Sequence, residues 1–261
     1  MKKLIFIPLL IFTFTLSAQF TKSGGAFLKT TNYFISAPSL PNPFPQIISV
    51  TETTTNTSDR TSHAITMPAE VDEGDLLIVF FSSDATTETD PLSIDSENSD
   101  DGWTDANTSV SATSVVVTVF WKIADSDGDT LTVLTNNAQM SVAQTYRITN
   151  FESADPVKIT FATSPTGDQY PNPPSGTGDY GADDYLWIVA YGADAWDSHA
   201  TAAPDNFTGL ETTYVNQASI CSINSAYREY NVNGAYDPGT FTANTSDEAW
   251  MTYTIIVNPI Q

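Results

Sequence analysis

The stretch Val115-Val-Val-Thr-Val-Phe-Trp-Lys-Ile123 decides the fold class of this chain. Apolar residues occupy all of its odd-numbered positions, while its even-numbered positions include a threonine and a lysine. An alternation of period two is typical of a β-strand with one buried face, so we expect the odd positions to point into a core. The acidic segment Asp125–Asp129 interrupts the pattern and Leu131–Val133 resumes it, which predicts a β-hairpin.

Further segments extend this prediction along the chain. Leu76–Phe81 and Tyr185–Ala190 are continuous apolar runs, which suit strands that are buried on both faces. Val157–Phe161 alternates between apolar and polar residues and predicts another strand. After residue 18, no window carries a convincing helical stripe. The predicted fold class is therefore all-β.

Motifs of the first part of the chain recur later in the same order, at offsets of about 104 to 110 residues. The matching pairs are Gly74–Asp84 with Asp183–Asp194, Trp103-Thr104 with Phe207-Thr208, Phe120–Lys122 with Ala226–Arg228, and Thr145–Ile148 with Thr252–Ile255. We expect one β-sandwich of jelly-roll type over residues 46–261, built from two sequence-similar halves at about 68–150 and 176–259. Two small modules are the alternative. The Pro- and Gly-rich stretch Ser164–Gly181 is expected to cross between the halves.

Several of these motifs resemble those of a known family. They are Met67-Pro68 with Gly74–Ile78, Gly102–Thr104, Trp121–Ala124, Tyr146–Ile148, Asp237–Phe241 and Ala249-Trp250 with Ile256–Pro259. The pattern is similar to β-sandwich modules of phage virion and tail-associated proteins and of uncharacterised secreted bacterial proteins, over roughly residues 46–260. The resemblance implies a sandwich fold. The chain differs from the phage virion proteins in its first residues, which have the layout of a signal peptide that those proteins usually lack.

The beginning of the chain has the layout of a secretory signal peptide. Lys2 and Lys3 precede the apolar stretch Leu4–Leu16, and the small residue Ala18 follows it. The stretch is shorter than the roughly 20 residues that span a bilayer, so we expect cleavage rather than a membrane anchor. Residues 19–45 carry several prolines and predict an extended arm or linker, either a tether or a strand lent to a neighbouring subunit.

Composition excludes several classes of function. The formal net charge is −22, which argues against binding to nucleic acid or to an anionic membrane surface. A single cysteine and two histidines leave little room for disulfides, for zinc or for histidine-based catalysis. The motifs of serine hydrolases and of nucleotide-binding folds are missing. We therefore expect a protein that is not an enzyme.

Acidic residues gather in one predicted loop, and carboxylates are the ligands that Ca²⁺ prefers. The candidate metal ligands are Asp84, Asp90, Asp95, Asp100 and Asp101. A solvated acidic surface is the other interpretation of this loop. Asp125, Asp127 and Asp129 also lie two apart, but their spacing lacks the EF-hand glycine and glutamate, so a turn is the better interpretation.

Aromatic residues in predicted loops suggest a second kind of site. Trp196, Tyr170 and Tyr180 are candidate ligand-binding residues, because exposed rings stack on the apolar faces of sugars. Our leading expectation is a secreted, non-catalytic structural, adhesive or self-assembling protein of the cell surface, with itself or surface glycans as partner. A glycan-binding module and a virion decoration or tail-associated protein are the alternatives.

Overall fold

The computed structural model describes residues 44–54, 59–84, 93–94, 102–111, 115–125, 129–164, 170–194, 199–215, 221–244 and 249–261. All regular structure in these ranges is β, with antiparallel strand pairs and no helix, so the predicted fold class is confirmed. The predicted signal peptide, and the predicted arm up to residue 43, lie outside the described ranges.

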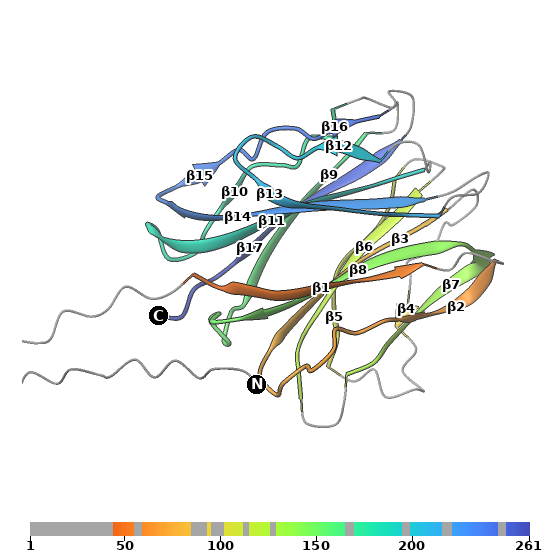
Figure 1. Ribbon diagram of the computed structural model, residues 1–261, viewed down its shortest axis with the longest axis horizontal. Coiled ribbons are helices and arrows are strands. Elements are labelled where there is room, and N and C mark those ends of the chain that lie inside the picture. The colour runs from red at the N-terminus through yellow and green to blue at the C-terminus, as the bar shows by residue number, and fades with distance from the viewer. Residues whose placement is uncertain are drawn as a thin grey trace, which may run out of the picture. The chain divides into compact units, whose positions relative to one another are not determined.

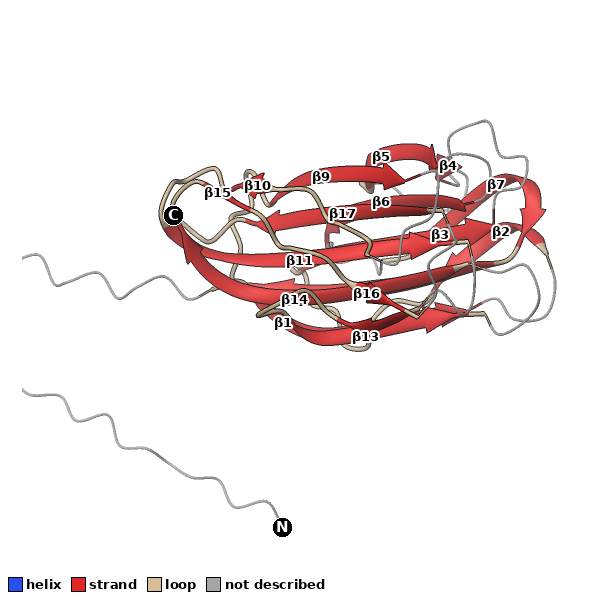
Figure 2. Ribbon diagram, turned by 90° about the horizontal axis from the view of Figure 1, so that it is seen from above, coloured by secondary structure: helices blue, strands red, loops and turns tan. Residues whose placement is uncertain are grey.

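Two five-stranded sheets stack face to face and form the expected β-sandwich (Figure 1). The first sheet contains, in order, β1 (Gln46–Thr54), β8 (Ser141–Thr149), β3 (Leu76–Asp84), β6 (Val115–Ile123) and β5 (Thr104–Ser111). The second sheet contains β13 (Thr208–Tyr214), β14 (Ser222–Val232), β11 (Asp183–Ala193), β17 (Trp250–Val257) and β9 (Val157–Ser164). Seen from above, the strands of the two sheets run along a common direction (Figure 2).

Three smaller sheets cover the outer faces of this sandwich. The outer face of the first sheet is covered by β2 (Arg60–Ile65), β7 (Leu131–Gln139) and β4 (Ser93–Ile94). The outer face of the second sheet is covered by two pairs, β10 (Gly176–Thr177) with β15 (Ala235–Tyr236) and β12 (Ala200–Ala202) with β16 (Thr242–Ala243). Each five-stranded sheet is therefore buried on both of its faces.

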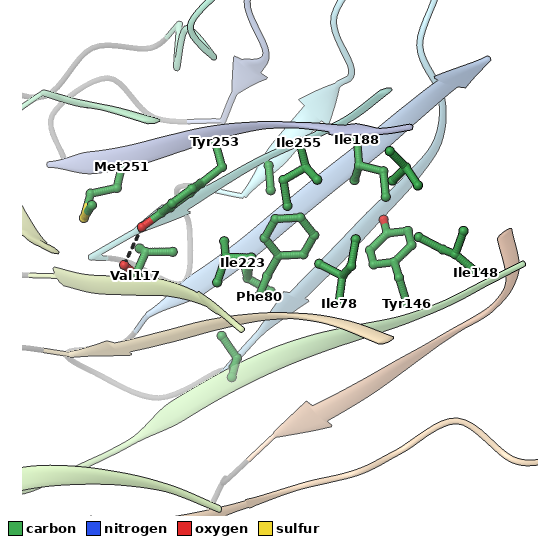
Figure 3. Packing of buried hydrophobic residues seen from close by; sticks show 14 of the residues in the cluster. Ile78, Phe80, Val117, Tyr146, Ile148, Ile188, Ile223, Met251, Tyr253 and Ile255 are labelled. Atoms are coloured by element: carbon green, nitrogen blue, oxygen red, sulfur yellow. Dashed lines mark hydrogen bonds between the residues drawn. The ribbon is translucent and has the colours of Figure 1, made fainter. Parts of the chain in front are cut away.

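The main core lies between the two five-stranded sheets (Figure 3). Ile78 and Phe80 of β3 meet Ile188 of β11 and Ile255 of β17 there. The Tyr253 hydroxyl donates a hydrogen bond of 2.6 Å to the carbonyl oxygen of Val117, so the two sheets are also joined by a polar contact. Figure 3 shows these side chains meeting from opposite sheets.

Burial on both faces explains the continuous apolar runs that the sequence analysis identified. Along β3, Leu76, Ile78 and Phe80 enter the core between the sheets. Their neighbours enter the cluster on the outer face; these are Leu77, Val79 and Phe81. β11 follows the same rule, so both runs are confirmed as central strands.

Two connections differ from the expectation. The hairpin predicted across Asp125–Asp129 is wrong, because β6 pairs with β3 and β5, whereas β7 pairs with β2 and β4 in the outer layer. A period-two pattern identifies strands but carries no information about their partners. Ser164–Gly181 joins β9 to β11 within one sheet, and the chain passes between the five-stranded sheets over residues 150–156.

Candidate functional site

The predicted metal site is described only at Asp84. The other four carboxylates, Asp90, Asp95, Asp100 and Asp101, lie outside the described ranges. Asp84 ends β3 and is half-buried, and its pKa is raised by burial first and then by the charge of Asp59. Among the described residues, no group of three or more His, Cys, Asp or Glu side chains could hold a metal ion. The calcium site stays a prediction.

The acidic turn after β6 forms ion pairs with a lysine of that strand. The Nζ atom of Lys122 lies 2.9 Å from a carboxylate oxygen of Asp125 and 2.8 Å from one of Asp129. Lys122 and Asp129 are buried, whereas Asp125 is half-exposed. Because a buried ammonium group needs a counter-charge, these two carboxylates neutralise a lysine of the strand that precedes them. Asp127 lies outside the described ranges.

A second buried cation is neutralised in the same layer. Arg147 of β8 donates from Nε to Asp75 at 2.5 Å and from Nη2 to Asp72 at 2.7 Å. The same oxygen of Asp75 accepts the backbone N–H of Asp72 at 2.8 Å. Both Asp75 and Arg147 belong to motifs that the sequence analysis quoted, but their separation along the chain gave no sign that they form a pair.

The candidate aromatic residues do not form one surface. Tyr170 and Tyr180 are exposed, but they lie toward opposite ends of β17. The carbonyl oxygen of Asn172, beside Tyr170, accepts a bond from Thr252, whereas Asp179, beside Tyr180, accepts one from Asn258. Those partners are about 20 Å apart along an extended chain. Trp196 lies outside the described ranges.

A hollow of about 460 Å³ beside β14 is a better-formed candidate binding site. It is lined by Asn206, Thr208, Tyr227, Arg228 and Glu229. β13 pairs with β14 only as far as Tyr227, so the remainder of β14 extends beyond its neighbour and leaves this space. A second hollow of about 390 Å³ lies near β12 and β16 and is lined by Ala202, Ala203, Asp205, Gly239, Thr240 and Thr242.

Aromatic rings hold the cation of the first hollow in place. The Arg228 guanidinium lies 3.8 Å from the centre of the Tyr230 ring, and its Nη1 donates a 2.6 Å hydrogen bond to the Tyr236 hydroxyl. The Tyr236 ring in turn packs edge-on against Trp187, with the ring centres 5.2 Å apart. A cation that is fixed in this way loses little freedom when it binds a hydroxyl or an anion. Arg228 corresponds to Lys122 in the sequence repeat, but no motif marked it as a candidate site residue.

A line of polar side chains crosses the core between the five-stranded sheets. Thr213 donates to Glu52 at 2.7 Å and accepts a 3.0 Å bond from Gln144 Nε2. Ser225 donates to Gln144 Oε1 at 2.5 Å and shares a second 2.5 Å hydrogen bond with Tyr146. Because each member has partners, the line joins β1 and β8 to β13 and β14 without leaving these groups unsatisfied.

The outer end of this line carries two carboxylates. Burial, and then the charge of Glu52, raises the pKa of Glu211. The burial of Tyr146 raises its pKa strongly, and the nearby charge of Glu211 adds to that shift. A raised carboxyl pKa beside a second acid is a feature of acid–base sites, but the inner members of the line are fully buried in the sandwich. Their bonds connect the two sheets.

Cys221 and one of the two histidines, His63, are sealed in the interior, whereas His199 is partly exposed and stacks on the Tyr214 ring. Cys221 is fully buried, its thiol donates to the carbonyl oxygen of Ser82, and burial raises its pKa to about 12. His63 is also buried, and burial lowers its pKa to about 4. Cys221 alternates in phase with Ile223 in the sequence, which favours a core position, and it lies in the core. The polar sequence around His63 gave no sign of its burial.

Comparison with known proteins found no relative of this chain. Within the described ranges, no helix has the length and apolar character that crossing a bilayer requires. No family model matches the chain, and neither a curated protein sequence nor a solved structure matches it.

Proposed function

We propose that this chain is a secreted, non-catalytic structural protein of the cell surface, built from two jelly-roll halves that pack through their five-stranded sheets. The observation that carries the proposal is the burial of Cys221 and His63 beneath a continuous double-faced core, away from any substrate. The layout of residues 1–18 supports export.

The strand orders of the two sheets support the duplication. From edge to edge, β1-β8-β3-β6-β5 corresponds to β9-β17-β11-β14-β13. The register with one neighbouring strand corresponds as well, since Ile78 lies opposite Trp121 in β6, and Ile188 lies opposite Tyr227 in β14. In both sheets the chain closes by pairing its first strand with its last.

The order of the smaller sheets supports the jelly-roll assignment. In an eight-stranded jelly roll, one sheet has the order first, eighth, third, sixth, and the other begins second, seventh, fourth. The first half has β1-β8-β3-β6 in one sheet and β2-β7-β4 in the other. Only β5 departs, because it extends the larger sheet. Under this proposal each half is a jelly roll with its own core, so the proposal adopts the alternative of two modules, which share an interface, over one jelly roll built from both halves.

Glycan binding is a second candidate function, favoured by the hollow at Arg228. Its lining combines a fixed guanidinium, an amide, a hydroxyl and a tyrosine, which are groups that protein sites use for sugar hydroxyls and ring faces. An adhesive surface protein would use such a site without catalysis.

Export is tested by expressing the full chain in a bacterial host and sequencing the N-terminus of the secreted protein. We expect the sequence to begin at Gln19 or within a few residues of it. An Ile11→Asp variant should remain inside the cell, whereas Ile48→Asp should be exported like the wild type. Intact wild-type protein in the cytoplasm would contradict the proposal, and recovery only in phage particles would favour the virion alternative.

Glycan binding is tested on an array with the wild type and three variants. Loss of binding in Arg228→Ala alone would place the site at the hollow, and loss in Trp196→Ala alone would place it in the predicted loop. Loss in Tyr170→Ala but not in Arg228→Ala would place the site near Thr252, at the beginning of β17. If the wild type binds no glycan, the structural function stands without an adhesive site.

A further inference from the structure

Among the described residues, four strands lie at the edges of the two five-stranded sheets, namely β1, β5, β9 and β13. An edge strand presents unpaired backbone N–H and C=O groups, which can pair with a strand of another molecule. Proteins prevent such pairing with β-bulges, charged side chains or prolines on the edge. The four strands differ in how far they carry these protections.

Three of the edges carry both a bulge and a carboxylate. Each contains one extra residue relative to its neighbour, which shifts the register within β1, β5 and β13. The extra residue distorts the ladder and the acid repels an approaching acidic chain. The acidic residues are Glu52 in β1, Asp105 in β5 and Glu211 in β13. The part of β14 that extends beyond β13 carries Glu229.

The fourth edge, β9, carries neither a bulge nor a carboxylate. All eight of its residues pair with β17 in one uninterrupted register, from Val157 opposite Val257 to Ser164 opposite Trp250. It contains no acidic residue and no proline, and most of its residues are β-branched or aromatic. Its single charge, Lys158, lies 2.6 Å from a carboxylate oxygen of Asp179 and is already paired.

An apolar side chain accompanies the open edge. Phe161 is 44% exposed although its ring packs against Tyr253, with the ring centres 6.1 Å apart. Most of the surface of a chain with a net charge of −22 repels a second copy. β9 is therefore the edge at which two copies can approach with the least repulsion and can cover an exposed ring.

We propose that β9 pairs with β9 of a second copy of this chain, so that the second sheets of two molecules join into one continuous antiparallel sheet. An antiparallel pair of identical strands has two-fold symmetry, so the contact closes at a dimer and does not propagate into a filament. This proposal deepens the structural function and uses no part of the export argument.

The experiment measures the mass of the full-length secreted protein by light scattering over a range of concentrations. Phe161→Glu places a charge on the open edge of β9. Ile48→Glu is the matched control, because Ile48 is 50% exposed on the protected edge β1. We expect a dimer for the wild type and for Ile48→Glu, and at least a tenfold higher dissociation constant for Phe161→Glu.

Thr163→Asp, on an exposed position of the same strand, keeps the proposal testable if Phe161→Glu does not fold. It should also weaken the dimer at least tenfold, with the thermal unfolding of the monomer little changed. A wild type that remains monomeric at about 100 μM would overturn the dimer, as would dimers that persist in both β9 variants. Disruption by Ile48→Glu alone would place the contact on β1. A monomer that is correctly exported leaves the proposed function standing.

Discussion

The outer face of the first sheet holds its buried cations with carboxylates, whereas the outer face of the second sheet is filled with aromatic rings. Arg147 and Lys122 of the first sheet each bond to two acidic residues. The corresponding strands of the second sheet contribute to a cluster of rings around Trp187. The members of that cluster with rings are Tyr185, Trp187, Tyr191, Phe207, Phe241 and Trp250, with Tyr230 and Tyr236 packed against it.

The difference is clearest at positions with equivalent partners. Leu77 lies opposite Lys122 and Arg147 in the first sheet, and Trp187 lies opposite Arg228 and Ile256 in the second. Arg147, which bonds to two carboxylates, thus lies at the position that Ile256 occupies in the second sheet, and Ile256 needs no counter-charge. The same strand order accommodates either chemistry, because each buried cation brings its own neutralising partners.

Trp187→Ala should have the largest effect on stability. Trp187 is fully buried at the centre of the ring cluster, and truncation of a core tryptophan typically costs about 3–5 kcal/mol. Chemical denaturation followed by circular dichroism measures the change. Trp187→Phe should cost less, because the indole Nε1 has no hydrogen-bond partner among the described groups. A loss below about 1 kcal/mol for Trp187→Ala would mean that the aromatic layer contributes little.

Arg147→Met should cost about 3 kcal/mol, because it leaves the buried carboxylate of Asp75 without its cation. The double variant Arg147→Met/Asp75→Asn should be more stable than this single variant, since it removes the unpaired charge as well. Lys158→Met is the control, because its exposed pair with Asp179 should contribute less than about 1 kcal/mol. Equal losses for the single and double variants would indicate that packing, and not charge, dominates at Arg147.

A fall in pH should destabilise the folded protein through His63. Thr135 donates its hydroxyl hydrogen to the carbonyl oxygen of Asn137, so it accepts the Nε2 hydrogen of His63, and Nδ1 accepts from Ser141. The folded-state pKa of about 4 lies below the ordinary value of 6.5, so the unfolded state binds the proton first as the pH falls. Stability should therefore decline between pH 6.5 and pH 4, by about 2–3 kcal/mol.

His63→Gln isolates this effect, because glutamine keeps hydrogen-bonding groups but does not titrate in this range. Denaturation at several pH values gives the difference between the two proteins, which should shrink as the pH falls from 6.5 to 4. The acids with a raised pKa, Asp84 and Glu211, titrate in both proteins and cancel in the difference. A difference that is constant with pH would contradict the buried, neutral state of His63.

Arg228→Met should have the smallest effect, about 1 kcal/mol. The substitution removes the contact with the Tyr230 ring and the bond to Tyr236, but it leaves no buried carboxylate behind. Thermal unfolding measures the loss, with Arg147→Met as the comparison. If Arg228→Met proved as costly as Arg147→Met, the two layers would depend on their cations to the same degree.

The sequence predicted the strands better than their partners. Two continuous apolar runs correctly predicted central strands, because burial on both faces requires apolar residues at every position; they are Leu76–Phe81 and Tyr185–Ala190. The sequence repeat equates Tyr146 with Tyr253. In the structure, Ile78 lies opposite Tyr146 and Ile188 lies opposite Ile255, so the repeat and the observed register differ by two residues. A shift of two residues keeps every side chain on the same face, so the apolar pattern could not detect it.

The charged residues show a further limit of the sequence. Lys122 occupies an even position that the alternation assigned to the solvent side, but an outer layer and two aspartates bury it there. The partners of Arg147 and of Gln144 come from distant segments. Local pattern contains no information about such tertiary pairs, so neither the ion pairs nor the polar line between the sheets could be predicted.

The pairing of β1 with β8 has a consequence for how the protein forms during synthesis. Gln46 lies opposite Thr149, so the first sheet cannot close until β8 has left the ribosome. Val157 lies opposite Val257, which delays the second sheet until the chain is almost finished. Closures over such long segments are slow. One face of the first sheet's core would stay uncovered while residues 150–257 are being synthesised. This is therefore the period of greatest aggregation risk.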